Sequence, residues 1–505
     1  MMNDNSMKDK QIRKPVSVHP SSAHLSSSFI VPLIFLINLV VYYITATPLL
    51  DDSDVPWHLA TGRLLLHTHH VPTTDPWSFA SAGQPWYLLS WIWDLILGIT
   101  EQSFGLFGIL VLVITISAAI PAAIAGHLLR IGVALPAIFF TVMIGSLCIM
   151  DFITARPHLS GYVMALVFYL ILHCSRENAA RYGKLLWLPP LMLIWANMHG
   201  SFIAGFSVLG AYIIEAFATK NKAWLKRLLI VSAACTICAA INPYGFDVII
   251  GAMKTMNGSA KQYTIEWLPF AFSASTGISA WLILFILVNN LRGSRAPLAD
   301  KILATGWMIG TFFVMRNGPI FIILSAPYLA ICLEEATEGL REIRPPSPFM
   351  LFMQRQNIRT VWLATLAAFL VFVGIASHLP NDDKYISEDM SVSDAIDYAT
   401  QHYPTHHYLT DFNFGGQVIY RTDGKLPFMM DSRAGTVYSE QAMQDYLDFM
   451  WQNDGWEERL KTYGINAIMI SNKGLFAKAF EKNQYHDHWQ LVFAGKRANV
   501  YIARP

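Results

Sequence analysis

Carboxylate and arginine side chains gather in the polar gaps that separate long apolar stretches of this chain. The first gap opens with Asp51-Asp52-Ser53-Asp54, and a further carboxylate, Asp75, follows within it. A carboxylate can take a proton from an acceptor hydroxyl or hold a divalent metal. Arginine offers a planar fork of donors to a phosphate. These residue types together suit a reaction in which a phosphate is the leaving group.

Later gaps contribute further polar residues. Arg156, His199, Glu266 and Arg316 each lie in or beside a short polar break between apolar runs. Polar side chains at the border of a membrane are costly and are more often functional than those on a soluble surface. If these breaks all open on the same side of the membrane, they form one site with the acidic residues of the first gap.

Each candidate also has a structural interpretation. Asp54 precedes a helical-looking stretch and could be its N-cap, and Asp52 could be a solvated loop residue. Asp75 stands in Thr-Thr-Asp-Pro, which is a turn signature. Arg156 could be a helix-end residue that reaches for the interface. His199 could be an interhelical hydrogen-bonding residue.

Two other patterns favour a structural role. The run His67-Thr68-His69-His70 lacks a second ligand cluster at a definite spacing, so we do not expect it to bind metal. The 5 cysteines are too few and too dispersed for a disulfide framework. Cys235 and Cys238 form a C-x-x-C pair inside an apolar stretch, which favours two small packing residues.

The composition predicts a polytopic membrane protein. Of the 505 residues, 54% are hydrophobic and only 14% are charged, whereas a soluble domain carries about 25% charge. The net charge of +1 gives no indication of nucleic-acid binding. We expect about eleven transmembrane helices, at about 29–49, 105–129, 132–150, 157–174, 185–197, 200–218, 225–241, 274–291, 300–315, 318–334 and 359–378.

Lysine and arginine set the expected orientation. Alternate gaps, starting with the N-terminal tail, hold most of the basic residues, so residues 1–28 should be a cytoplasmic tail. The first apolar run is too long for a cleaved signal peptide and should remain as an anchor. The segment 86–100 is short and flanked by tryptophans, which favours an interfacial helix over a span. The acidic first gap, 51–104, then lies outside the cytoplasm.

The C-terminal residues 380–505 have no apolar run of membrane length and should form a small soluble α/β domain. The patterns predict buried strands at 407–410, 427–431 and 467–471, helices at 441–451 and 456–463, and a hairpin of 489–493 with 499–502. Gly415-Gly416 and Asp431-Ser432-Arg433 are candidate functional loops, although turn chemistry also explains them. The expected topology places this domain outside the cytoplasm as well.

Several strings resemble those of bacterial members of the GT-C glycosyltransferase superfamily, which is the superfamily of the dolichyl-phosphate-mannose–protein mannosyltransferases. The resemblance covers most of the chain. It departs at Pro56, where the group often has an aromatic residue, so it leaves the shape of the helix start open. The strings are Asp52–Arg63, Val71–Ser78, Ala155–His158, Trp195–Gly200, Asn242–Gly245, Glu266-Trp267, Asp411–Gly416 and Asp431–Arg433.

The resemblance implies a GT-C-like transmembrane domain at 29–378 and a sugar donor linked to a polyprenyl phosphate. Asp54 would act as the catalytic base, and Asp52 would support it. A divalent metal, Mg²⁺ or Mn²⁺, occurs in some branches, and Asp52 and Asp54 would then be its ligands. Arg156 and Arg316 would bind the donor phosphate. Further residues would contact or orient the acceptor: His199, Asp75 and Glu266.

The expected function is therefore transfer of a sugar to a lipid, glycan or protein acceptor at the outer face of the bacterial inner membrane. A non-enzymatic alternative stays open, either a transporter of lipid-linked glycans or a scaffold in envelope assembly. A transporter would have related halves, and the sequence has no convincing internal repeat. A scaffold would tolerate loss of the outer carboxylates.

Overall fold

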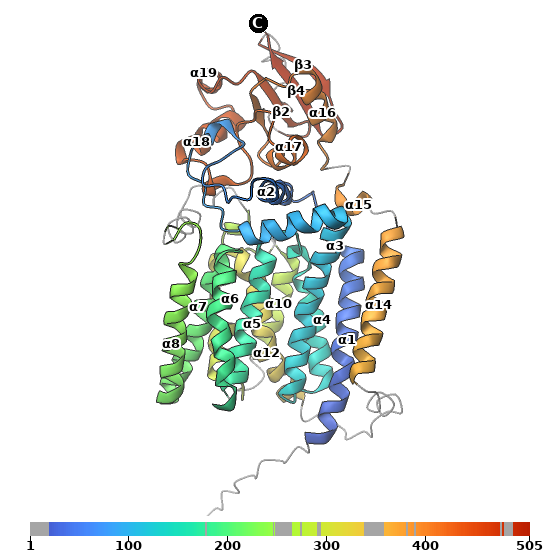
Figure 1. The fold of residues 1–505 in the computed structure, drawn as a ribbon, viewed down its shortest axis with the longest axis vertical. Helices are drawn as coiled ribbons and strands as arrows, with labels where there is room; N and C mark the ends of the chain where they lie inside the picture. Colours follow the sequence, from blue (N-terminus) through green and yellow to red (C-terminus); the bar gives the residue numbers. More distant parts are fainter. Residues whose placement is uncertain are drawn as a thin grey trace, which may run out of the picture.

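The computed structural model describes residues 20–176, 179–245, 247, 265–272, 275–289, 294–337, 358–379, 382–387, 390–474, 477–478 and 488–504. A bundle of upright helices forms the lower part of the molecule, and a smaller α/β unit lies above it (Figure 1). The bundle consists of α1 (Pro20–Thr45), the second part of α3 (Trp91–Arg130), α4 (Leu135–Cys148), α5 (His158–Arg176), α6 (Leu188–Ala196), α7 (Ile203–Ala218), α8 (Lys222–Ala239), α10 (Thr276–Asn289), α11 (Leu298–Phe313), α12 (Gly318–Thr337) and α14 (Ile358–His378).

These helices occupy the apolar segments that the sequence predicts to be membrane spans. Five helical stretches are long and apolar enough to cross a membrane, judged by length and composition. Three shorter apolar helices accompany them, at Phe29–Thr45, Leu135–Cys148 and Thr276–Asn289. The helical polytopic fold is thus as predicted, whereas the count of eleven spans stays a prediction.

Two helices lie crosswise on top of the bundle. They are α2 (Val55–Thr68) and the first part of α3, which covers most of the predicted interfacial segment 86–100 (Figure 1). Gly105 ends this part of α3 with φ 62° and ψ −164°, a conformation open only to glycine. Gly62 and Gly98 lie where α2 crosses α3, and a Cβ on either would clash with the backbone of the other helix. The two glycines therefore let α2, which follows the acidic loop of residues 51–54, rest directly on the first part of α3.

The α/β unit contains a four-stranded sheet with the order β1-β2-β4-β3. The parallel pair is β1 (Tyr408–Thr410) with β2 (Ala467–Ser471), and β4 (Ala498–Ala503) runs antiparallel to both β2 and β3 (Trp489–Ala494). The helices of the unit are α15 (Asp382–Tyr385), α16 (Ser393–His402), α17 (Gly415–Thr422), α18 (Glu440–Trp451) and α19 (Trp456–Thr462). The predicted hairpin, strands 407–410 and 467–471, and both predicted helices are present.

Two predictions for this unit are wrong. Residues 427–431 are buried but form no strand, because their pairing with β1 is limited to a single bridge between Tyr408 and Phe428. Gly415 and Gly416 do not form a loop; they begin α17. Two glycines in sequence suggest a turn, but tertiary contacts of this helix start override that local preference.

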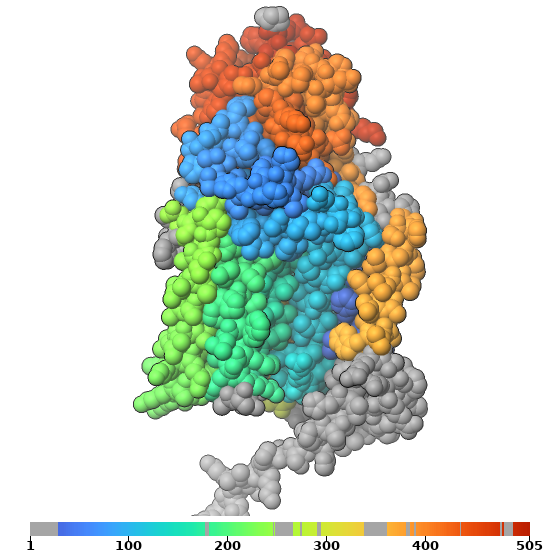
Figure 2. All heavy atoms as spheres, in the orientation of Figure 1, coloured from blue at the N-terminus to red at the C-terminus, as the bar shows by residue number. Residues whose placement is uncertain are grey.

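The first outer loop belongs to the core of the α/β unit. Trp57, Trp86 and Leu88 share one buried hydrophobic cluster with side chains of residues 392–501. In Figure 2, the blue atoms of this loop lie between the upright helices and the orange C-terminal unit. The acidic loop is thus enclosed between two structural layers and is not a free loop above the bundle.

The expected topology can be tested by labelling intact cells with a membrane-impermeant thiol reagent. Single-cysteine variants at Ser439, which precedes α18, and at Lys222, which begins α8, place an exposed thiol on opposite ends of the molecule. By the positive-inside rule, the first should label and the second should not. The reverse pattern would invert the orientation and move the acidic loop to the cytoplasm.

Candidate functional site

Arg156 is the centre of a cluster of carboxylates between the bundle and the α/β unit. Its Nη2 lies 2.5 Å from Asp54 Oδ2, and its Nη1 lies 2.8 Å from Glu266 Oε1 and 3.5 Å from Asp52 Oδ2. Arg316 Nη1 lies 3.4 Å from the other oxygen of Glu266. The structure therefore brings together five of the predicted site residues, which come from four separate polar gaps.

Local structure aims the two aspartates at Arg156. The Asp54 backbone N–H donates to Asp52 Oδ1 (2.9 Å), which folds the loop into a tight turn just before α2. Asp54 occupies the N-cap position of α2, but its side chain makes no capping hydrogen bond. Its Oδ1 instead accepts from Trp57 Nε1 (3.3 Å). Capping therefore does not account for this carboxylate, which is directed into the ion-pair cluster.

The two aspartates differ in their electrostatic environment. Burial raises the pKa of Asp52; Arg156 opposes this rise, while Asp54 and Glu266 add to it. Burial also acts to raise the pKa of Asp54, but Arg156, the Ser432 hydroxyl and His58 outweigh it, and the pKa of that carboxyl falls below its ordinary value. Asp54 is therefore the more firmly ionised member of the pair.

Glu266 links the two arginines. Burial acts to raise its pKa, but Arg156 and Arg316 outweigh that effect and lower the pKa of Glu266 to about 2. The guanidinium of Arg316 also lies 5.2 Å from the centre of the Trp267 ring, a cation–π contact that holds its plane. Both arginines are thus oriented by neighbours on η6 (Ile265–Trp267).

His199 lies near the same cluster. Burial lowers the pKa of His199 well below its ordinary value, and Arg316, His158 and Arg156 act in the same direction. Its Nδ1 accepts the backbone N–H of Ser201 (3.1 Å). The neutral ring therefore carries its proton on Nε2, which makes Nε2 a donor. The interhelical role considered from the sequence is replaced by a local cap on the turn before α7.

A buried histidine–aspartate pair beside the site was not predicted. His58 Nδ1 lies 2.7 Å from Asp94 Oδ1, and Ser90 Oγ donates to the other oxygen of Asp94 (2.9 Å). His58 follows Asp54 by one helical turn of α2, so helix spacing alone would have placed it on the same face. The identity of its partner on α3 has no signal in the sequence.

Asp75 lies apart from the cluster. It accepts hydrogen bonds from the backbone of Trp77 and Ser78 and from the hydroxyls of Ser78 and Ser81, so the turn interpretation is correct for its local structure. It also pairs with Arg433 of the α/β unit at 2.7 Å. Asp75 is not among the carboxylates that contact Arg156 in the described part of the chain.

The carboxylates do not fit a metal site. The Arg156 guanidinium contacts Asp52, Asp54 and Glu266 and takes the central position that a cation would need. Among the described residues, no group of three or more His, Cys, Asp or Glu side chains is arranged to hold a metal ion.

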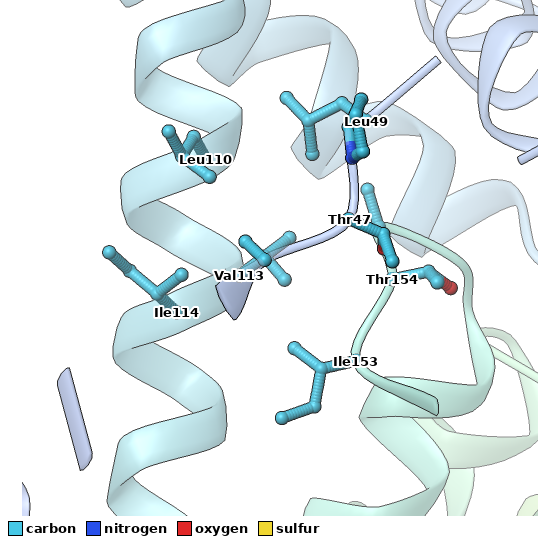
Figure 3. A pocket seen from close by; sticks show the side chains of 10 residues that line it. Thr47, Leu49, Leu110, Val113, Ile114, Ile153 and Thr154 are labelled. Atoms are coloured by element: carbon cyan, nitrogen blue, oxygen red, sulfur yellow. The ribbon is translucent and has the colours of Figure 1, made fainter. Parts of the chain in front are cut away.

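A small apolar crevice is lined by residues that adjoin the cluster residues in the sequence (Figure 3). It is formed by the segment that leads to Asp51, the segment that leads to Arg156, and α3. Its lining contains no charged side chain, so it offers no site for a sugar or phosphate. The lining residues are Ala46, Thr47, Pro48, Leu49, Leu110, Val113, Ile114, Ile153, Thr154 and Ala155.

Comparison with known proteins identifies the fold. No family model and no curated protein sequence matches the chain. Among solved structures, the chain is similar to the apo oligosaccharyltransferase of Archaeoglobus fulgidus, with a TM-score of 0.58 and 11% identity over 89% of this chain and 69% of that one. It is also similar to ArnT from Cupriavidus metallidurans bound to undecaprenyl phosphate, with a TM-score of 0.53 and 14% identity over 94% and 98%.

The fold of the chain follows from these likenesses. Both relatives are membrane glycosyltransferases of the GT-C type, and each similarity extends over most of this chain. The chain therefore has the fold of these two proteins, which is the fold that the resemblance to the GT-C superfamily implies. Fold alone does not fix an activity, so the function must be argued from the Arg156 cluster.

Proposed function

We propose that this protein transfers a sugar from a polyprenyl-phosphate-linked donor to an acceptor hydroxyl at the outer face of the bacterial inner membrane. The observation that carries the proposal is the Arg156 cluster, in which Asp52, Asp54 and Glu266 surround one buried guanidinium. The GT-C fold and the undecaprenyl phosphate bound to ArnT support a lipid-linked donor.

The two arginines would bind the donor phosphate. In the structure, Arg156 contacts three carboxylates, and Arg316 contacts one of them, Glu266. A phosphate that enters between them would draw donors of Arg156 away from Asp54, since charge-assisted bonds of arginine to phosphate are among the strong ones. His199 Nε2 would add a neutral donor beside the phosphate or the acceptor.

Asp54 would then act as the base. While paired with Arg156 at 2.5 Å, its carboxylate is a weak proton acceptor. Once the donor phosphate takes over Arg156, the pKa of Asp54 rises and the carboxylate can accept the proton of the acceptor hydroxyl. The acceptor oxygen forms a bond to the sugar carbon, and the polyprenyl phosphate leaves with the electrons of the broken bond. Asp52 and Glu266 keep Arg156 oriented.

Mass spectrometry of the cell envelope tests this proposal. Glycolipids and glycoproteins from cells with and without the protein should differ by one glycosylated species, and the unmodified acceptor should accumulate in its absence. Identical envelope profiles under conditions of full expression would contradict the proposal and favour the non-enzymatic scaffold.

The arginines should matter for their shape as well as their charge. Arg156→Lys and Arg316→Lys keep the positive charge but lose the fork that two phosphate oxygens can share. Each variant should weaken donor binding about tenfold, which corresponds to about 1.4 kcal/mol. The measurement is the dependence of the rate on donor concentration. Arg421→Lys, which alters an exposed pair with Asp397, is the matched control, and unchanged donor dependence in both site variants would remove them from the phosphate site.

A further inference from the structure

The α/β unit forms hydrogen bonds to the acidic loop from two sides. On one side, the backbone N–H groups of Leu49 and Leu50 donate to the carbonyls of Lys384 (2.9 Å) and Tyr385 (2.7 Å). The Ser387 N–H donates to the Asp51 side chain (2.8 Å). These bonds fix the residues just before Asp52 to α15, the first helix of the α/β unit, and to the residues that follow it.

On the other side, α17 and the loop after residue 430 press on Ser53, the residue between the two aspartates. The Ser432 hydroxyl donates to the Ser53 carbonyl oxygen (3.1 Å). Gly416 lies against the same carbonyl, and a Cβ at this position would clash with it. The absence of a side chain at Gly416 is thus what allows α17 to contact the backbone of the acidic loop.

Ser432 also acts on the Asp54 carboxylate. Its hydroxyl bonds to the carbonyl of Ser53, the residue directly before Asp54, and it acts to lower the pKa of the Asp54 carboxyl. The bond to the Ser53 carbonyl fixes the backbone directly before Asp54. Ser432 therefore positions the carboxylate through the backbone of the loop.

We propose that the α/β unit completes the active site, with Ser432 as a positioning residue for Asp54 and Gly416 as the contact that seats it. This inference rests on the proposed function. The α/β unit would then form one side of the active site. The orientation of the catalytic carboxylate would depend on Ser432, which lies far from Asp54 in the sequence.

The test compares Ser432→Ala with Ser432→Thr in the full-length protein, assayed for transfer from a polyprenyl-phosphate-linked sugar. The alanine variant should lower kcat about tenfold with little change in the KM for the donor. Its acidic limb in the pH profile of kcat should move to higher pH, because the hydroxyl that acts to lower the pKa of Asp54 is lost. Threonine keeps the hydroxyl and should restore both values.

Ser439→Ala is the matched control within the same unit. Ser439 caps α18 by accepting the Ala442 N–H (3.2 Å), so its loss weakens the unit by about 1 kcal/mol without touching the acidic loop. A shifted pH profile in this control, or an unshifted one in Ser432→Ala, would overturn the positioning role.

A cross-link separates failure of this inference from failure of the proposed function. In a variant without the native cysteines, cysteines at positions 53 and 432 should be joined in membranes by a short bifunctional thiol reagent, with or without substrate. No cross-link would overturn the seating of Ser432 on the acidic loop. A cross-link in a protein whose wild type transfers no sugar would retain the contact and reject the glycosyltransferase.

Discussion

Replacement of Asp54 by asparagine is expected to lower the transfer rate by about 10²- to 10⁴-fold, the usual contribution of a general base. An amide cannot accept a proton at neutral pH, but it keeps the size of the side chain and an oxygen for the indole N–H of Trp57. Because Asp54 makes no side-chain cap, α2 loses no hydrogen bond. Arg156 retains Asp52 and Glu266 as partners, so the fold should persist.

The control for this experiment is Asp423→Asn. Asp423 is an exposed carboxylate that ends α17 in the left-handed conformation, which asparagine adopts readily. The Asp423→Asn protein should be expressed and should transfer sugar like the wild type. Full activity of a well-expressed Asp54→Asn protein would remove Asp54 as the base and favour Asp52, whose raised pKa makes it the stronger proton acceptor.

The helical bundle could be predicted because apolar runs of membrane length leave few alternatives. The convergence of Asp52, Asp54, Arg156, Glu266 and Arg316 could also be predicted, since one topology rule places all of their gaps on one side. The sequence does not show which of these side chains contact each other. Asp52 and Arg156 are 104 residues apart, and no local pattern indicates that their side chains touch.

The α/β unit shows the same limit. Its strands and later helices follow from alternating and helical patterns, yet α17 was missed because Gly415-Gly416 resembles a turn. The glycines serve packing instead: a Cβ at Gly415 would clash with Asp431 and one at Gly416 with Ser53. Phe428, Met429 and Met430 are apolar side chains in the core, and they do not extend the sheet. Burial and strand pairing produce the same apolar sequence, so the pattern alone cannot separate them.

Asp75 and Arg433 illustrate a long-range partnership with a structural consequence. Arg433 Nη1 lies 2.7 Å from Asp75, and its Nη2 lies 2.6 Å from Asp431; all three side chains are 0% exposed. The guanidinium also lies about 5 Å from the ring centres of Trp77 (5.0 Å) and Trp86 (4.9 Å). One arginine thus joins the first outer loop to the α/β unit through two buried carboxylates and two aromatic rings.

Arg433→Ala should therefore destabilise the seating of the α/β unit by about 3–5 kcal/mol, the usual cost of stranding a buried charge. Two carboxylates would remain in the core without a counter-charge. Arg421→Ala is the control, because its pair with Asp397 is partly exposed (39% and 63%) and should contribute about 0–1 kcal/mol. The measurement is proteolysis in membranes across a urea series, which reports the free energy of opening of the α/β unit.

The stability of the α/β unit should decrease as the pH falls. Burial acts to raise the pKa of Asp75, but Arg433 and the serine hydroxyls outweigh it and leave the pKa lowered. A carboxyl with a lowered pKa in the folded state stabilises that state above its ordinary pKa and loses this contribution as the pH falls through the folded value. The urea midpoint of the wild type should thus fall on acidification below the ordinary pKa of aspartate. Equal urea midpoints for Arg433→Ala and Arg421→Ala at neutral pH would show that Arg433 does not hold the α/β unit on the first outer loop.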